Sequence, residues 1–303
     1  MRRGLAIPTA LLGGALLSAL LPGAQPAPAA EDAGAAATTV RIGLLGNLFR
    51  DAPEPLIQVL AKPFKSLMED QAGFVAQVVV GGDAEAMAVQ IKEGKIEIAV
   101  FQGFEFAWAR LKNPELKPLL ICVNQQPFAR SVLVVHQDCK ATRTDDLHGK
   151  ILAMPRLARE HARIFVERRC VQPGMPMDKW FDKVMAPRTA SDALDDVAEN
   201  LAQATVVDDL DLEAFRKTYP KTASRLRVLL ESETFPCAVI AYQPGTLDPT
   251  MLLRLRAGMI AAKTTTRGSK LLEMCRITSF EAIPANYEQN LADILKAYPP
   301  PTK

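Results

Sequence analysis

Short apolar segments alternate with amphipathic segments from residue 40 onward, and this alternation limits the fold more than any other feature of the sequence. Each apolar segment has the length of a strand and is followed by glycine or a polar residue. Each amphipathic segment repeats apolar side chains at helical spacing. The predicted strands are 40–46, 74–80 and 96–101, and the predicted helices are 55–69, 84–92 and 105–111. Strand–helix repeats of this length predict parallel strands joined by right-handed crossovers, with helices on both faces of the sheet.

The same alternation starts again after residue 119. The predicted strands are 119–123, 131–135, 151–154, 204–207, 226–230 and 238–242, and the predicted helices are 159–169, 191–201, 250–262 and 268–274. Two α/β lobes follow from this order, with lobe I formed by 40–124 plus 236–303 and lobe II, residues 125–235, inserted into it. The chain crosses between them twice, which predicts a hinge and a ligand-binding cleft lined by the loops after the strands.

The N-terminus has the layout of a secretory signal peptide. A basic start, Met1-Arg2-Arg3, precedes an apolar stretch from Leu5 to Leu21 and then a tract of small residues. We therefore expect residues 1–30 to be removed, residues 31–39 to be a flexible spacer and the protein to be periplasmic or otherwise exported. An uncleaved membrane anchor is the alternative, but the stretch is short for a bilayer and is interrupted by proline and glycine. The first cysteine is Cys122, so no cysteine at the end of the signal could carry a lipid.

Composition and motifs exclude several classes of function. The 36 Lys and Arg residues nearly balance 34 Asp and Glu, and no basic run predicts a nucleic-acid-binding face. The sequence contains no G-x-S-x-G, H-E-x-x-H, Walker A or G-x-G-x-x-G pattern, and its three histidines have no suitably spaced partners. We therefore expect neither catalytic residues, nor a metal, nor a cofactor.

Five cysteines in an exported protein allow two disulfides and one free thiol. The sequence does not assign their connectivity. A Cys139–Cys170 bridge is the first expectation, because both residues are predicted at the same end of lobe II, and Cys122–Cys237 is the second.

Four segments carry a resemblance to a known family. They are Val40–Gly46, Gly94–Gly103, Arg130–Val135 and Asp145–Ala153, and the last contains a Leu-x-Gly-Lys run. From residue 40 to 275 the chain resembles the phosphate/phosphite/phosphonate-binding group of type 2 periplasmic solute-binding proteins, which feed ABC importers. The resemblance implies a two-lobed α/β fold, with two mixed sheets flanked by helices and hinged by two crossover strands. It also implies a small anionic, phosphonate-like or phosphate-like solute, an ABC permease as partner, and a monomer.

The resemblance also implies positions for the ligand site. The family's hydroxyl-rich triplet, at the start of the first helix of the inserted lobe, aligns with Arg159, Glu160 and His161. A family tyrosine falls near Phe106, with Phe104 at the usual proline position. A family histidine falls at Ala190 or Ser191.

Further candidates come from the residues themselves. Arg159 and His161 can offer charge-assisted hydrogen bonds to an oxyanion, although a solvated helical face is the alternative for this segment. The remaining candidates follow predicted strands or a crossing, and they are Asn47, Phe49, Gly103, Ser131 and Asp208. Each has a structural alternative, as a turn residue, hinge backbone or helix cap, and for Asp208 the functional role is to receive a ligand amine.

Two other functions stay open. A sensory or scaffold module with a degenerate cleft would use the same fold without transport. An exported enzyme is the third hypothesis, and it would require a nucleophile and a base in the cleft.

Overall fold

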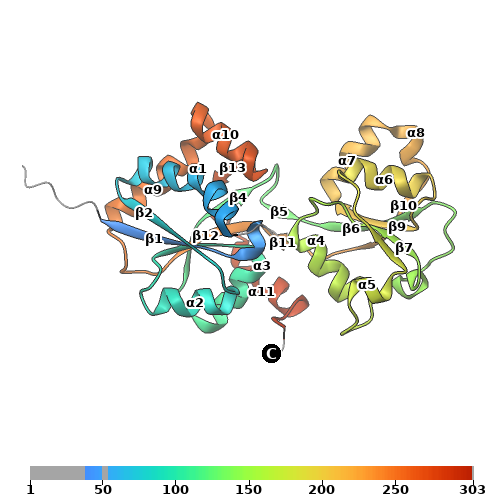
Figure 1. Ribbon diagram of the computed structural model, residues 1–303, viewed down its shortest axis with the longest axis horizontal. Helices are drawn as coiled ribbons and strands as arrows, with labels where there is room; N and C mark the ends of the chain where they lie inside the picture. Colours follow the sequence, from blue (N-terminus) through green and yellow to red (C-terminus); the bar gives the residue numbers. More distant parts are fainter. Residues whose placement is uncertain (1–37, 50–53, 302–303) are drawn as a thin grey trace, which may run out of the picture. The chain divides into compact units, whose positions relative to one another are not determined.

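The structure, a computed structural model, describes residues 38–49 and 54–301. The predicted signal peptide and most of the predicted spacer lie outside these residues. The described residues form two lobes, each built on a mixed sheet with helices on both faces (Figure 1). The predicted fold class is therefore confirmed.

The lobe I sheet has six strands in the order β13-β4-β12-β3-β1-β2. Their bounds are β1 (Thr39–Leu44), β2 (Val75–Val80), β3 (Ile98–Phe101), β4 (Lys117–Val123), β12 (Ala238–Tyr242) and β13 (Ser279–Glu281). Strand β1 pairs in parallel with β2 and β3, as the strand–helix repeats predict, whereas β12 and β13 pair antiparallel with β4. The loops that follow β1 and β3 therefore emerge at the same edge of the sheet.

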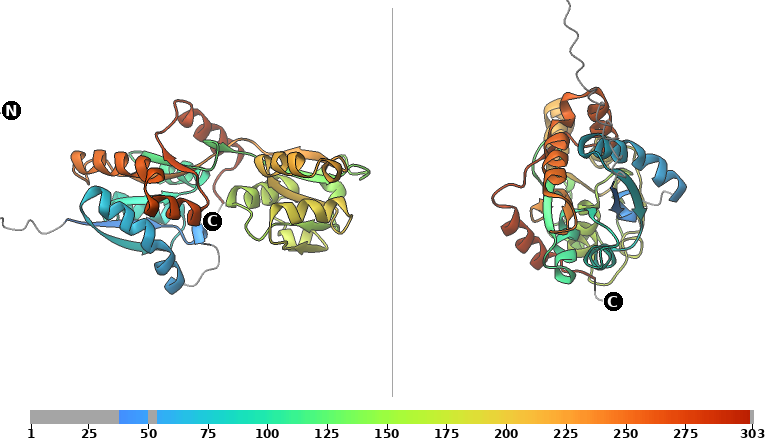
Figure 2. Two further views of the ribbon diagram at one scale, coloured as in Figure 1. Left: turned by 90° about the horizontal axis from the view of Figure 1, so that it is seen from above. Right: turned by 90° about the vertical axis from the view of Figure 1, so that its left-hand side faces the viewer.

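Two groups of helices cover this sheet. The helical segments are η1 (Gly46–Phe49), α1 (Glu54–Ala72), α2 (Ala84–Lys92), α3 (Gly103–Lys112), α9 (Pro249–Ala261), η4 (Ala262–Thr264), α10 (Thr266–Cys275) and α11 (Tyr287–Ala297). Buried side chains of α1, α9 and α10 pack on one face, and those of α2, α3 and α11 pack on the other. Figure 2 shows this layering from two further directions.

The lobe II sheet has five strands in the order β10-β6-β9-β7-β8. They are β6 (Ser131–His136), β7 (Ile151–Ala153), β8 (Lys183–Met185), β9 (Ala204–Asp208) and β10 (Leu226–Glu231). The helical segments are η2 (Thr144–Leu147), α4 (Glu160–Phe165), η3 (Val166–Cys170, a π-helical turn), α5 (Met177–Trp180), α6 (Ala190–Ala198), α7 (Asp209–Thr218) and α8 (Pro220–Ala223). Because β7, β8 and β9 are parallel, the starts of α4, α6 and α7 all lie at one edge of the sheet.

The two crossings between the lobes pair with each other. Strand β5 (Phe128–Ala129) of the first crossing runs antiparallel to β11 (Phe235–Pro236) of the second. Beside this pair, Ser131 N donates to Ser232 Oγ at 2.9 Å, and Ser232 N donates to Ser131 O at 2.8 Å. The paired segments form the double connection that a hinge between two lobes requires.

The cysteines correct both expected disulfides, because all five are free. Cys170 is fully buried in the core, whereas Cys139 lies partly exposed in the loop after β6, so the expected bridge between them is wrong. Cys122 lies opposite Ala238 in the ladder between β4 and β12. Cys122 and Cys237 are both free and pack against different hydrophobic clusters, so the second expected bridge is also wrong. In the described part of the chain, no helix is both long and apolar enough to cross a membrane.

Candidate ligand-binding site

Three of the predicted residues meet at the edge of the lobe II sheet. Asp208 is the last residue of β9, and Arg159 and His161 lie at the start of α4. His161 Nε2 lies 2.7 Å from Asp208 Oδ1, and Arg159 Nε lies 3.4 Å from Asp208 Oδ2. The side chains of His161 and Asp208 are only 9% and 14% exposed, so this is a nearly buried ionic cluster.

The two basic groups keep Asp208 ionised. Burial alone would raise the pKa of Asp208, but the charge of His161, its hydrogen bond and the charge of Arg159 outweigh burial and lower the pKa below its ordinary value. The carboxylate of Asp208 therefore occupies the position in which these two side chains can hold an oxyanion.

Arg159 also reaches across to lobe I. Its Nη2 donates to the carbonyl oxygen of Arg276 at 2.8 Å, directly after α10. Arg159 and Asp208 border a small hollow with residues of both crossings, and the other lining residues are Asn124, Gln126, Phe128, Ala129, Asp209, Leu210 and Cys237. The volume that the centre of a water molecule can reach there is about 20 Å³, which suits one water rather than a solute.

A second polar cluster lies at the matching edge of the lobe I sheet. Asn47, in η1 after β1, donates from Nδ2 to Glu105 Oε1 at 2.5 Å, and the backbone N–H of Gln102 donates to Glu105 Oε2 at 3.2 Å. Glu105 lies in the first turn of α3 and is 5% exposed. Asn47 Oδ1 is buried and has no hydrogen-bond partner among the described residues.

Glu105 differs from Asp208 in its protonation. Burial raises the pKa of Glu105 to about 7, and the hydrogen bonds from Asn47 and Gln102 only partly oppose this rise. The negative charge of Glu160, at the start of α4 in lobe II, raises the pKa further. The predicted residues Asn47 and Glu160 thus both act on a carboxyl that the sequence did not single out.

The predicted aromatic residues are packed in the core. Phe104 is 3% exposed and lies 5.0 Å from the ring of Trp108 and 6.1 Å from that of Phe235. Phe106 is fully buried, and its ring lies 6.0 Å from that of Phe101. Neither ring lines the hollow beside Arg159.

The other predicted residues have structural surroundings. A Cβ on Gly103 would lie 2.1 Å from the carbonyl oxygen of Pro236, so glycine allows α3 to approach the second crossing. Ser131 is fully buried opposite Asp208 in the ladder of β6 and β9, and its Oγ has no partner among the described residues. Ser191 is in the first turn of α6, whose start lies at the same edge of the lobe II sheet as the start of α4. Phe49 ends η1, and its side chain lies outside what the structure describes.

Sequence reasoning missed three contributors to these clusters. Glu105 was hidden because an acidic residue in the first turn of a helix is an ordinary capping signal. Arg276 enters through its backbone oxygen, for which no side-chain pattern exists. Phe235 lies in a crossing, where a single aromatic residue gave no periodic signal; its ring lies 5.3 Å from that of His161.

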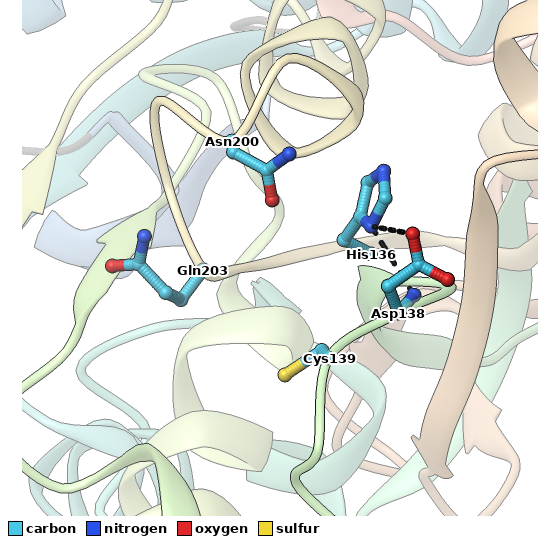
Figure 3. A pocket seen from close by; sticks show the side chains of 5 residues that line it. All are labelled: His136, Asp138, Cys139, Asn200 and Gln203. Carbon is cyan, nitrogen blue, oxygen red and sulfur yellow. Dashed lines mark hydrogen bonds and ion pairs between the residues drawn. The ribbon is translucent and has the colours of Figure 1, made fainter.

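A larger hollow lies at the opposite edge of the lobe II sheet, where β6 ends and β9 begins. His136, Asp138, Cys139, Asn200 and Gln203 line it, and the volume reachable by a water centre is about 220 Å³. Figure 3 shows His136 turned toward Asp138, whose backbone N–H donates to His136 Nδ1 at 3.2 Å. None of the predicted site residues lines this hollow.

Comparisons with known proteins point to one family. The model of the family described as "ABC transporter, phosphonate, periplasmic substrate-binding protein" matches residues 53–287. No curated protein matches the chain at a significant level.

Several solved structures share the fold. A Xanthomonas citri protein bound to ATP is 15% identical, with a TM-score of 0.55 and coverage of 86% of this chain and 97% of that one. PhnD1 of Prochlorococcus marinus, in complex with methylphosphonate, is 14% identical, with a TM-score of 0.54 and the same coverage. A binding component of an ABC phosphonate transporter from Pseudomonas aeruginosa is 15% identical, with a TM-score of 0.52 and coverage of 85% of each chain. At these identities the likeness establishes the fold alone.

Proposed function

The chain belongs to the periplasmic substrate-binding proteins of phosphonate ABC transporters, and we propose that it binds a small anionic solute at Arg159 and His161, between its two lobes. Arg159 and His161 converge on one carboxylate, and this single observation carries the proposal. A phosphonate, phosphate or carboxylate oxygen can accept the same charge-assisted hydrogen bonds.

Asp208 has a defined part in this proposal. Its carboxylate pairs with both basic side chains, of which His161 is nearly buried and Arg159 is about one-third exposed. The adjacent hollow of about 20 Å³ cannot hold a solute. Binding therefore requires the carboxylate to turn away, the lobes to move at the crossings, or both.

Movement of the lobes requires that the chain connects them only through the two crossings. We propose lobe boundaries at 40–124 plus 236–303 for lobe I and 125–235 for lobe II, with the paired crossings as the hinge. The closed form would then be recognised by an ABC permease.

The test is a titration with a panel of small anions, followed by thermal unfolding and calorimetry. Suitable ligands are methylphosphonate, phosphate, phosphite, a short sulfonate and, because a relative in fold was solved with it, ATP. At a ligand concentration near 100 times Kd, we expect stabilisation of about 2.7 kcal/mol and a rise in Tm of several degrees. No shift with any ligand at millimolar concentration would contradict the anion assignment.

Two substitutions locate the site. Arg159→Met should abolish the shift, because it removes the main charge. Asp208→Asn should increase affinity for the anion about tenfold, since it removes a competing negative charge. Asp145→Asn is the matched control, because Asp145 carries the same charge in an exposed ion pair with Arg143.

A sensory or scaffold module is a second candidate, and the pairing of Arg159 and His161 with Asp208 favours it. If the wild-type protein binds no ligand of the panel while Asp208→Asn binds several, the cleft is blocked by its own carboxylate and the sensory or scaffold assignment is preferred. The family itself comprises transport proteins rather than enzymes, and we propose that the chain has no catalytic activity. Turnover of a phosphate monoester by the purified protein would contradict this.

Membership of the family implies export to the periplasm. We propose that residues 1–30 direct this export and are then removed. N-terminal sequencing of the exported protein should give a first residue near position 30, and a full-length exported chain would contradict cleavage.

A further inference from the structure

The C-terminal segment, residues 287–298, makes hydrogen bonds to the second crossing at Glu233, Thr234 and Cys237. Tyr287 OH in α11 donates to the carbonyl oxygen of Cys237 at 3.2 Å, and Asn290 Nδ2 donates to the carbonyl oxygen of Thr234 at 3.0 Å. Directly after α11, Tyr298 OH donates to Glu233 Oε2 at 2.6 Å. Three side chains of one short segment thus fix the crossing that leads from lobe II back to lobe I.

Tyr298 is the centre of these contacts. Its side chain is fully buried, and burial and the bond to Glu233 raise the pKa of its hydroxyl. Its backbone oxygen accepts a hydrogen bond from Trp108 Nε1 of α3 at 2.8 Å. On the other side, the guanidinium of Arg169, in η3 of lobe II, lies 5.3 Å from the Tyr298 ring and also pairs with Glu233. Tyr298 therefore joins α3 of lobe I to a helical segment of lobe II.

An aromatic chain runs from Tyr298 to the candidate site. Phe235 is 1% exposed. The centroid of its ring lies 4.8 Å from that of the Tyr298 ring and 5.3 Å from that of the His161 ring. Nε2 of the same imidazole lies 2.7 Å from Asp208 Oδ1. The imidazole therefore contacts both an aromatic ring on the crossing and a carboxylate on β9.

We propose that Tyr298 and Phe235 are positioning residues for the ligand site, which hold His161 on Asp208 and so make ligand affinity depend on the C-terminal segment. The proposal rests on the proposed function where it concerns affinity. The placement of His161 itself can be measured without any ligand.

The first experiment removes the ring of Tyr298. In Tyr298→Leu, Phe235 loses its neighbour and Glu233 loses a donor, so we expect affinity for methylphosphonate to fall roughly tenfold. Tyr298→Phe keeps the ring against Phe235 and should stay within about threefold of the wild type. Tyr219→Leu is the matched control, because Tyr219 is 49% exposed beside α7 and touches none of these residues.

The second experiment follows the histidines by NMR. The chain has only three, His136, His148 and His161, so their imidazole signals can be assigned by single substitution. In ligand-free Tyr298→Leu, the His161 signals should move, because the position of the Phe235 ring changes, while those of His136 and His148 should stay. Tyr298→Met removes the same ring but fills more of its space with a flexible side chain, and it provides the same test if Tyr298→Leu does not fold.

The outcomes separate the two proposals. Unchanged His161 signals in whichever of Tyr298→Leu and Tyr298→Met folds would overturn the positioning role, whatever the ligand results. If the His161 signals move but the wild-type protein binds no anion of the panel, the proposed ligand class fails and the positioning role stands. If the wild-type protein binds an anion and Tyr298→Leu binds it with the same affinity, the positioning role is also overturned.

Discussion

Two buried carboxyl groups, Glu105 in lobe I and Asp208 in lobe II, lie at or just beyond the end of a strand, and their pKa values shift in opposite directions. Each follows or ends a strand at the edge where parallel strands end. Burial raises the pKa of both groups, but Asp208 is bound by His161 and Arg159, whereas Glu105 receives only neutral N–H donors. Topology therefore fixes where the carboxyl groups lie, and the charge of their neighbours decides whether they ionise.

The two lobes also differ in the charge of the side chains at their candidate ligand-binding edges. Lobe II presents basic groups that are already ordered around an oxyanion. Lobe I presents a carboxyl whose pKa of about 7 makes its charge sensitive to pH near neutrality, beside an amide oxygen that is buried without a described partner. In the proposed binding mode, a solute between the lobes would meet the basic pair on one side and the pH-sensitive carboxyl of Glu105 on the other.

The largest effect on stability should come from removing the ionised carboxylate of Asp208. Asp208→Ala leaves His161 and Arg159 without their anion, so we expect the free energy of unfolding at pH 7 to fall by about 3–5 kcal/mol. The folded pKa of Asp208 is lowered, so its stabilisation is present above the unfolded pKa and is lost as pH falls through the folded pKa. Urea titrations at pH 7 and pH 3 should show that the free energies of unfolding of variant and wild type differ less at pH 3 than at pH 7. Asp145→Ala, in an exposed ion pair, should cost about 0–1 kcal/mol.

Glu105→Gln removes the carboxyl whose pKa is raised. Its pH dependence should be opposite to that of Asp208→Ala, because the pKa of Glu105 is raised and that of Asp208 is lowered. Since the folded pKa is about 7 against an ordinary 4.5, the folded protein holds a proton that the unfolded chain releases. Stability of the wild type should therefore decrease by roughly 2–3 kcal/mol as pH rises from 5 to 8. The variant should lack this decrease, as measured by urea unfolding across that range. An identical pH dependence in both proteins would show that Glu105 ionises normally, and Glu199→Gln, in an exposed ion pair, controls for the loss of one charge.

Sequence patterns predicted the fold well because its elements are locally encoded. The apolar segments around Ile42, Val78 and Ala99 have the length and composition of buried parallel strands, and they pair as expected. The helix predicted at 159–169 forms as α4 followed by a π-helical turn. The helix from Tyr287 to Ala297 was not predicted, although its buried residues Tyr287, Leu291 and Ile294 repeat at helical spacing.

The candidate site was predictable only residue by residue. The family resemblance placed Arg159 and His161 among the candidate site residues, and a position at the end of a predicted strand added Asp208. No local pattern reveals that they bind one another, because this depends on how α4 is rotated against the sheet. The same limit applies to Phe235, whose contacts with His161 and Tyr298 join segments that are far apart in sequence.

The smallest effect should come from Asn47, and it bears most directly on what holds Glu105. Asn47→Ala removes the Nδ2 donor to Glu105 Oε1, which stabilises the ionised carboxylate more than the neutral acid. The pKa of Glu105 should rise further, and stability should fall by about 1 kcal/mol at pH 8 but by less at pH 5, where the acid form predominates. Asn113→Ala is the matched control, because Asn113 Nδ2 donates at 2.7 Å to the neutral amide of Gln243, and its cost should be the same at both pH values. An equal cost for Asn47→Ala at pH 5 and pH 8 would mean that Asn47 supports the backbone of η1 rather than the charge of Glu105.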